Sequence, residues 1–305
     1  MELLAIGEVL WDVFPDKERL GGAALNFCAN LQRLGDRPTL LSAVGDDPRG
    51  TLILEKMREL DLSTRGTRQV DQWPTGIAMI NGADSGDHSF TIPRPAAFDD
   101  VSVSSKIFQE VQHAKVDWLY FGTLMQTTKA VEDLTTRLAS SSPHLRCFYD
   151  MNLREDHWNL GLVQRLSRLA SILKVNELEA QILYNLTPHE GSNFSVEKFC
   201  NAWASAYEIE LICVTLGPAG CTIYDRGSIC SAPGYQVSVC DTVGAGDAFS
   251  AAFLHGYASG WPTLAIAQFA NALGAIVASR AGATPQWSVR ECYELMADAV
   301  TIEPS

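Results

Sequence analysis

The run from Asp241 to Asp247 combines glycines and carboxylates in a pattern that could handle a phosphate group. Gly244 and Gly246 flank Ala245, and the apolar spacing that follows predicts that a helix begins here. The first N–H groups of a helix lack acceptors within the helix and attract anions, and glycine lets a phosphate approach the backbone closely. The run therefore predicts a phosphate-binding turn at a helix start.

Asp247 needs its own explanation, because a carboxylate beside such a turn repels the phosphate that the turn would bind. The carboxylate has a purpose if it takes a proton from an attacking hydroxyl while the N–H groups hold the charge on a transferred phosphoryl group. The alternative is a plain helix start in which Asp247 is a capping or first-turn acid. The run by itself leaves both interpretations open.

The elements that would position this turn alternate between strand and helix patterns. This alternation, with continuous apolar strands, predicts an α/β fold with a mostly parallel sheet covered by helices. The predicted strands are residues 3–9, 39–44, 118–121, 146–149, 172–175 and 211–215. The predicted helices are residues 23–34, 51–60, 129–140, 161–169, 178–184, 196–207, 248–259, 263–279 and 289–299.

Two stretches interrupt this alternation. Residues 75–80 and 88–92 have strand patterns, and residues 81–87 between them are rich in turn formers. A hairpin inserted between strand-helix units is predicted, with residues 11–14 as a companion strand. Such a hairpin could be a lid over a site or an edge hairpin.

Composition excludes several classes of function. The chain has 305 residues and a formal net charge of -13, which argues against a protein that coats nucleic acid. It shows no basic signal-peptide start and no apolar run near the roughly 18–20 residues that a membrane span needs. The eight cysteines include no CxxC pair and suggest neither a zinc knuckle nor a disulfide framework. A cytoplasmic protein without nucleic-acid or membrane partners is expected.

Motifs of other enzyme classes are missing. A P-loop kinase needs a Gly-Lys dipeptide, which occurs nowhere in the chain. A dinucleotide-binding dehydrogenase needs a glycine fingerprint after its first strand, but Gly7 is followed by Glu8 and the glycine-rich run lies near the C-terminus. A zinc hydrolase would need a His/Cys cluster, and the six histidines are dispersed.

The run Asp241–Asp247 resembles the C-terminal signature of the ribokinase-like (PfkB) carbohydrate kinases. Further segments that resemble motifs of this family lie in the family's order along nearly the whole chain. They are residues 7–12, 21–26, 176–179, 214–220, 270–272 and 279–283. The resemblance implies one domain over residues 1–305 with a three-layer αβα fold, a mostly parallel central sheet and a small β lid formed by about residues 11–20 and 74–97.

The resemblance also implies residue roles on the sugar side. Asp12 and Asn26 would hydrogen-bond sugar hydroxyls, and Gly21 and Gly22 would let the backbone pass under the sugar. The sugar would bind between the lid and the C-terminal ends of the strands, where lid motion would exclude water. The alternatives from the residues alone are a turn acid for Asp12 and a helix cap for Asn26.

Asn176 and Glu179 lie one helical turn apart at a predicted helix start. Their spacing is that of a capping box, in which each side chain bonds the backbone of the other residue. The resemblance implies that Asn176 binds nucleotide and that Glu179 organises Mg²⁺, through water, because Mg²⁺ keeps much of its hydration shell. The two roles can coexist.

The same resemblance assigns the remaining nucleotide and cation residues. ATP and Mg²⁺ are implied as cofactors, together with a monovalent cation such as K⁺. The implied nucleotide-binding residues are Thr215, Gly217, Gly220 and Asn271, in addition to Asn176. The implied monovalent-cation residues are Asp241, Val243, Ser279 and Gly282.

Residues typical of the fructokinase-like branch suggest the sugar. The segment Asp150, Asn152 and Arg154 resembles this branch, as does Arg94 at the exit of the lid hairpin, and all four are predicted to contact substrate. Fructose is therefore the expected acceptor. The same side chains would also serve 2-keto-3-deoxygluconate, and ribose or nucleoside kinases share the fold.

One alternative from a different class of protein stays open. It is a non-catalytic sugar-binding protein of this fold, although such a protein would gain nothing from a carboxylate at Asp247. The branch assignment is also weakened at Ala24, where fructokinase-like sequences usually carry proline. A lid sheet with exposed edges could pair with a second copy, so a homodimer is a further possibility.

Overall fold

The computed structural model describes residues 1–81, 89–154, 156–188 and 193–300. The predicted turn at residues 81–87 falls almost wholly outside them. The chain divides into two compact units, one of residues 1–146 with 153–158 and one of residues 147–152 with 159–305. The single domain that the sequence predicts stays a prediction, and each unit is described by itself.

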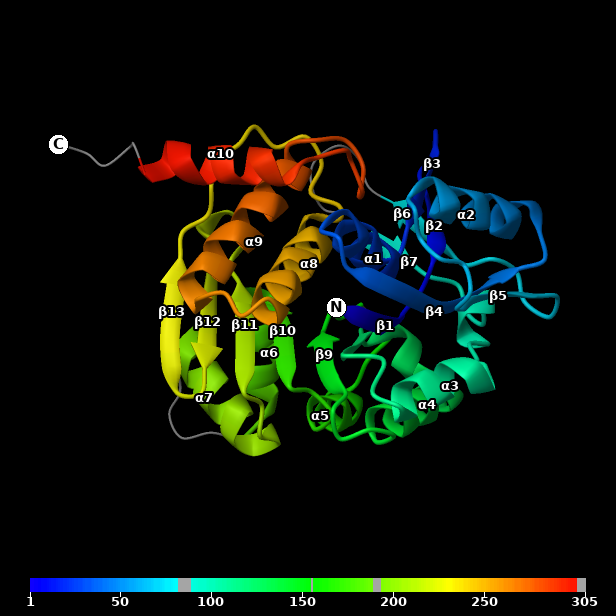
Figure 1. Ribbon diagram of the computed structural model, residues 1–305, viewed down its shortest axis with the longest axis horizontal. Helices are drawn as coiled ribbons and strands as arrows, with labels where there is room; N and C mark the ends of the chain where they lie inside the picture. The colour runs from blue at the N-terminus through cyan, green and yellow to red at the C-terminus, as the bar shows by residue number, and fades with distance from the viewer. Residues whose placement is uncertain (82–88, 155, 189–192, 301–305) are drawn as a thin grey trace. The chain divides into compact units, whose positions relative to one another are not determined.

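The first unit contains a sheet in which every strand pairs in parallel. Because connections between parallel strands place helices on the faces of a sheet, three of its four strands are buried and almost wholly apolar, whereas the edge strand of residues 67–70 exposes Arg68 and Gln69. The strands, in spatial order, are β8 (Trp118–Phe121), β1 (Glu2–Ile6), β4 (Arg37–Gly45) and β5 (Thr67–Val70). The helices of this unit are α1 (Ala23–Arg33), α2 (Pro48–Glu59), α3 (Ser105–Gln112) and α4 (Lys129–Ala139) (Figure 1).

The first unit also carries a separate four-stranded sheet. Its order is β3 (Glu18–Gly21), β2 (Leu10–Val13), β6 (Ile77–Asn81) and β7 (Ser89–Thr91). The pair β6 and β7 is the predicted hairpin, and β2 is its companion strand, paired in parallel with β6. Sequence patterning missed β3, because Glu-Arg-Leu-Gly contains no β-branched or aromatic residue.

The sheet of the second unit is parallel only in part. Its order is β13 (Ser228–Ala232), β12 (Cys221–Asp225), β11 (Leu211–Thr215), β10 (Ile172–Asn176) and β9 (Arg146–Asp150). Strands β9 to β11 pair in parallel, whereas β12 and β13 form an antiparallel hairpin. Arg226 and Gly227 at its tip both have positive φ, as a tight hairpin turn requires. The sequence patterns predicted neither of these two strands.

The helices of the second unit cover this sheet. They are α5 (Leu160–Ser167), α6 (Glu177–Leu186), α7 (Val196–Tyr207), α8 (Ala245–Ala258), α9 (Thr263–Ala278) and α10 (Val289–Val300). Helices α8 and α9 pack along one another, and α9 also contacts β12 and β13 (Figure 1). Helix α8 begins at Ala245 rather than at the predicted 248, so the glycine-rich run forms its first turn. Within the described residues, no helix has the length and apolarity to cross a membrane.

Candidate active site

The glycine-rich run is the start of helix α8. Gly244 is the N-cap, with φ 81° in the left-handed region, and no side chain caps the helix. Asp247 is a half-buried acid in the first turn, so the structure does not support the alternative of Asp247 as the cap. The N–H of Ala245 donates to the carbonyl of Thr242 at 3.3 Å, which closes the turn. Gly246 and Asp247 follow in the first turn, and their N–H groups have no carbonyl acceptor within the helix because the helix begins only at Ala245.

A second loop packs against this turn. A Cβ atom at Gly244 would lie 2.3 Å from the carbonyl oxygen of Ala283. The carboxylate of Asp241 accepts hydrogen bonds from the N–H groups of Val243 and Gly282, each at 3.1 Å. Hydrogen bonds therefore join three of the four residues predicted to bind a monovalent cation, namely Asp241, Val243 and Gly282.

The fourth residue of that set ends helix α9. The Ser279 hydroxyl donates to the carbonyl of Ile276 at 2.7 Å. Ser279 is followed closely by Gly282, which contacts the Asp241 carboxylate. The structure thus brings the four residues to one region, and cation binding by them stays a prediction.

A cavity of about 490 Å³ lies beside the turn, wholly within the second unit. All five residues predicted to bind nucleotide line it, namely Asn176, Thr215, Gly217, Gly220 and Asn271. Ala245 and Gly246 of the turn line it as well. Residues that the sequence analysis did not identify complete the wall, and they are mostly apolar: Pro218, Gly234, Tyr235, Gln236, Val237, Val239, Thr242, Phe249, Gly274, Ala275 and Ala278. An apolar cavity that ends at a helix N-terminus suits a ligand with a flat ring at one end and phosphates at the other.

Asn271 holds one wall of this cavity. It is 7% exposed, and its Nδ2 donates to the carbonyls of Ala232 and Pro233 at 3.1 and 3.0 Å. Gly220 packs against the same segment, because a Cβ there would lie 2.1 Å from the carbonyl oxygen of Ala232. The side-chain amide of Asn271 therefore positions the backbone directly before Gly234, which lines the cavity.

Asn176 and Glu179 form the capping box of helix α6. The Glu179 N–H donates to Asn176 Oδ1 at 2.9 Å, and the Asn176 N–H donates to Glu179 Oε2 at 2.9 Å. The capping interpretation is confirmed. Asn176 also lines the cavity, so the residue predicted to bind nucleotide is both a cap and part of the wall.

The predicted sugar residues of the first unit gather around the glycine pair. A Cβ at Gly21 would lie 2.3 Å from Asp12 Oδ2, so glycine leaves the room that this carboxylate occupies. Gly22 has φ 113°, and a Cβ there would lie 2.3 Å from the carbonyl oxygen of Glu8. The N–H of Asn26, whose residue is 4% exposed, donates to the carbonyl of Gly22 at 3.0 Å. The structure brings Asp12, Gly21, Gly22 and Asn26 together.

Glu8 is part of the same cluster, although it was not among the predicted site residues. Its Oε1 accepts from the N–H of Ala23 at 3.1 Å and so serves helix α1, whose N-cap Gly22 has no side chain to do so. Burial raises the pKa of the Glu8 carboxyl, and nearby N–H groups with the guanidinium groups of Arg154 and Arg94 offset part of this rise. An acid directly after a buried apolar strand is the signal that could have identified it.

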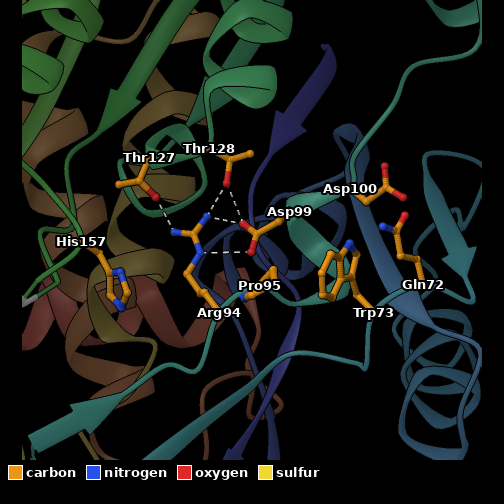
Figure 2. A pocket seen from close by; sticks show the side chains of 9 residues that line it. All are labelled: Gln72, Trp73, Arg94, Pro95, Asp99, Asp100, Thr127, Thr128 and His157. Atoms are coloured by element: carbon orange, nitrogen blue, oxygen red, sulfur yellow. Dashed lines mark hydrogen bonds and ion pairs between the residues drawn. The ribbon is translucent and has the colours of Figure 1, made fainter.

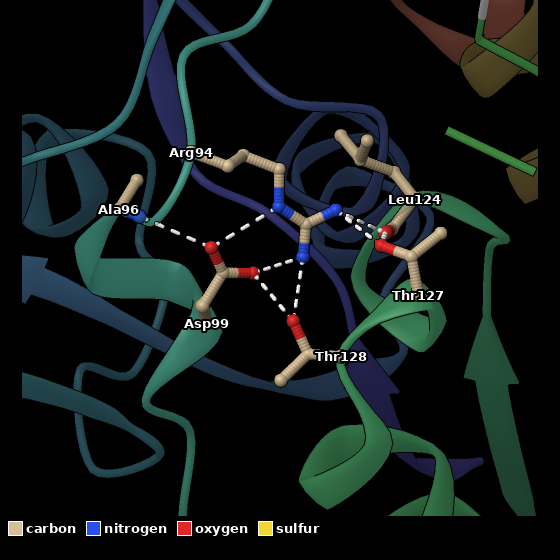
Figure 3. Close-up of polar contacts among 6 residues, drawn as sticks. All are labelled: Arg94, Ala96, Asp99, Leu124, Thr127 and Thr128. Atoms are coloured by element: carbon tan, nitrogen blue, oxygen red, sulfur yellow. Dashed lines mark hydrogen bonds and ion pairs between the residues drawn. The ribbon is translucent and has the colours of Figure 1, made fainter. Parts of the chain in front are cut away.

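Arg94 is the centre of a polar cluster in the first unit (Figure 3). Its Nε donates to Asp99 at 3.1 Å, one Nη donates to the Leu124 carbonyl at 2.8 Å, and the other donates to the Thr128 hydroxyl at 2.7 Å. Two further bonds reach the Thr127 hydroxyl and the second oxygen of Asp99. A guanidinium has five N–H donors, and all five have acceptors here. A substrate oxygen would have to displace one of them, so substrate contact by Arg94 stays a prediction.

The cluster forms one wall of an open cavity of about 560 Å³ (Figure 2). In Figure 2 the side chains of Arg94, Asp99, Thr127 and Thr128 point toward one another. The cavity is lined by Gln72, Trp73, Arg94, Pro95, Asp99, Asp100, Thr127, Thr128 and His157. Arg94 thus links the exit of the lid hairpin to the segment after β8.

Arg94→Gln should lower the free energy of unfolding by about 3 kcal/mol, since it leaves the nearly buried carboxylate of Asp99 without its cation. A urea titration would measure the loss. Arg290→Gln is the control, because Arg290 forms a solvent-exposed pair with Glu294 and should cost less than about 0.5 kcal/mol. If the two variants lose the same stability, the cluster does not clamp the lid exit.

The remaining predicted substrate residues, Asp150, Asn152 and Arg154, differ in burial and in their polar partners. Asp150 is fully buried, and its two carboxylate oxygens accept from Lys174 Nζ at 3.0 Å and from the Ser250 hydroxyl at 2.7 Å. The predicted substrate contact of Asp150 therefore conflicts with its position in the interior. Asn152 has φ 45°, and half-buried Arg154 forms no ion pair within the described residues. Substrate contact by these two stays a prediction.

The comparisons with known proteins identify the family of the chain. A family model described as pfkB family carbohydrate kinase matches residues 7–290. The candidate sugar kinase PH1459 of Pyrococcus horikoshii is 28% identical over 317 residues, which cover 96% of this chain and 94% of the relative. A fructokinase of Escherichia coli is 28% identical over 268 residues, with 83% of each chain covered.

Solved structures show the same fold over nearly the whole chain. A fructokinase from Xylella fastidiosa with bound ATP has a TM-score of 0.83 at 22% identity and covers 98% of this chain and 99% of its own. A double mutant of Vibrio cholerae fructokinase with fructose, ADP and potassium ion bound has a TM-score of 0.80 at 21% identity, with 97% and 98% covered. A candidate ribokinase II from Escherichia coli in complex with ATP and Mg²⁺ has a TM-score of 0.81 at 20% identity, with 97% and 99% covered. The predicted ribokinase-like α/β fold with a small β lid is confirmed.

Proposed function

The chain belongs to the pfkB family of carbohydrate kinases, and on this premise we propose that it transfers the γ-phosphoryl group of ATP to a primary hydroxyl of a sugar, with fructose as the first candidate. The observation that carries the proposal is the cavity of the second unit, which ends at the first turn of helix α8. Its apolar wall would hold the adenine, and the phosphates would reach Ala245 and Gly246.

The first turn of α8 supplies the groups for phosphoryl transfer. Its N–H groups would receive the negative charge that develops on the transferred phosphoryl group. Asp247 stands in the same turn, where its carboxylate would take the proton of the attacking hydroxyl. On the sugar side, Asp12 and Asn26 would hold hydroxyl groups above the Gly21–Gly22 backbone.

The residues at the start of helix α6 fit a magnesium ion that arrives with ATP. Oxygen atoms are the ligands that Mg²⁺ takes. Asn176 lines the cavity, and the buried carboxylate of Glu179 is joined to Asn176 by the capping box. Bound with ATP, Mg²⁺ offsets the charge of the phosphates. Glu179 would orient its water ligands, and Asp241, Val243, Ser279 and Gly282 would hold K⁺ in the loop beside the turn.

Fructose is proposed first because fructokinases recur among the relatives and because the segment Asp150–Arg154 is typical of that branch. At 24–28% identity, such relatives do not fix the substrate. Within the predicted set of sugar ligands, Asp150 has the least support, because it is buried and bonded to Lys174 and Ser250.

A coupled assay of ADP release should show turnover of fructose with the highest kcat/KM among fructose, ribose, 2-keto-3-deoxygluconate, tagatose phosphate and adenosine. A reaction without acceptor gives the background hydrolysis of ATP. A higher kcat/KM for another sugar would correct the substrate and leave the kinase assignment standing. Tight binding of one sugar without any turnover would favour the sugar-binding alternative.

A further inference from the structure

Lys174 is a buried cation in the middle of an apolar strand. The residues Ile172 to Val175 of β10 are all buried, and Lys174 is 5% exposed. Lysine is almost never buried without a partner, because removal of an ammonium from water costs several kcal/mol. The residue is absent from the predicted site, and its position in an otherwise apolar strand is the signal that could have identified it.

The ammonium lies directly beneath the first turn of α8. A Cβ built on Gly246 would be 3.5 Å from Lys174 Nζ, although Gly246 itself is exposed. Lys174 Nζ donates to Asp150 Oδ1 at 3.0 Å. The Ser250 hydroxyl lies 2.7 Å from the other oxygen of Asp150 and 2.9 Å from the carbonyl oxygen of Gly246. A chain of polar contacts thus connects β10 and β9 to the backbone of the turn.

The charge of Lys174 faces several carboxylates. Burial lowers the pKa of its ammonium, but the carboxylates of Asp150, Glu179 and Asp247 outweigh this effect, so the pKa lies above its usual value. The lysine is therefore charged at neutral pH. Without it, the turn would face these carboxylates alone, and an anionic phosphoryl group would be repelled.

Stability alone does not account for this arrangement. A buried ion pair can often be replaced by apolar residues of similar volume without loss of stability. The pair of Lys174 and Asp150 lies instead beneath the turn at which the proposed reaction places the anionic phosphoryl group. The position of the ammonium under Gly246, rather than elsewhere in the core, is what requires a functional reason.

We propose that Lys174 is a positioning residue for phosphoryl transfer. It holds the Gly244–Asp247 turn through Asp150 and Ser250, and its charge lets an anionic phosphoryl group bind at that turn. This inference rests on the proposed role of that turn. It assigns to Asp150 the task of orienting Lys174 in place of a contact with sugar.

Two variants distinguish an effect of the Lys174 charge from a merely structural role of Lys174, because they change the charge beneath the turn in opposite directions. Lys174→Met removes the cation, and the affinity for Mg²⁺ with a non-hydrolysable ATP analogue should fall about tenfold. Asp150→Asn removes the nearby anion but keeps the cation and an oxygen that can accept its hydrogen bond, so the same affinity should rise by about threefold. Adenosine, which carries no phosphate, should bind both variants as it binds the unaltered protein. Isothermal titration calorimetry would measure all these dissociation constants.

The outcomes are distinct. Weaker binding of the ATP analogue by both variants to the same extent, or weaker binding of adenosine by Lys174→Met, would show a structural role only and overturn the proposal. Unchanged binding of the analogue by Lys174→Met would overturn it as well. If Lys174→Met does not fold by circular dichroism, the double variant Lys174→Met with Asp150→Asn replaces it. This double variant should bind the analogue more weakly than Asp150→Asn, and equal binding would overturn the proposal.

The measurement does not depend on the sugar or on turnover. Failure of the proposed function would appear in the turnover of Asp247→Asn and in the acceptor screen. Failure of the present inference would appear in the binding of the ATP analogue or of adenosine, and neither measurement requires turnover.

Discussion

Asp247→Asn should reduce kcat by about 10³-fold while the affinity for the sugar changes little. The amide keeps the size of the side chain in the first turn of α8 but cannot take a proton from the attacking hydroxyl. The loss should therefore appear in kcat rather than in KM, because an interaction made only in the transition state is removed. The measurement is steady-state ADP release with the sugar that the screen identifies.

Glu177→Gln is the matched control. Glu177 is an exposed acid in the first turn of α6, as Asp247 is an acid in the first turn of α8. An acid that only complements the helix dipole contributes about 0.3–1 kcal/mol to stability. If Asp247 were such an acid, its amide variant would resemble Glu177→Gln and keep full activity. Retention of more than about a tenth of the rate by Asp247→Asn would exclude it as the base.

Gly244→Ala should lower kcat by about 100-fold and destabilise the protein by about 3 kcal/mol. Two effects combine at this position. Gly244 has φ 81°, which side chains other than glycine rarely adopt, and the added methyl group would lie 2.3 Å from the carbonyl oxygen of Ala283. Because that contact is with backbone, the turn has to move, and the N–H groups that it presents move with it. Steady-state kinetics and thermal unfolding would measure the two losses.

The variant Gly282→Ala separates the effect of a positive φ from the effect of a steric clash. Gly282 has φ 86°, but a Cβ there would have nothing within 4 Å. Its alanine variant should cost only the backbone strain, about 1 kcal/mol of stability, so the two variants are compared by thermal unfolding. Equal losses in the two variants would mean that the contact with Ala283 does not hold the turn in place.

Most of the fold could be predicted from local patterns. Buried parallel strands are continuous apolar runs, and amphipathic helices alternate with them, so β1, β4, β8, β10 and β11 were predicted within a few residues. Strands without that signature were missed. Strand β13 is exposed along much of its length and β3 is polar and short, so neither shows a buried apolar run. In β12 the buried residues are only Cys221, Thr222 and Ile223.

The candidate nucleotide cavity could also be predicted in large part. Its glycines and asparagines belong to short segments that resemble motifs of the family, and the resemblance implied their nucleotide-binding role. Asn176, Thr215, Gly217, Gly220 and Asn271 all line it. The apolar side chains around them were not identified, because an alanine or phenylalanine on a helix has the same pattern whether it faces the core or a ligand.

The sequence by itself determined the helix start at the glycine-rich run and the family to which its order of motifs belongs. Only the tertiary structure decided what surrounds those motifs. Asp150 and Ser250 meet across 100 positions of the chain, and Lys174 lies under Gly246, so an acid predicted to contact sugar is instead the partner of a buried lysine. Similarly, Arg94 uses all its donors on Asp99 and on a segment 30 to 34 positions away. Local patterns specify helices, strands and turns, whereas the partner of a buried charge depends on which distant elements pack against it.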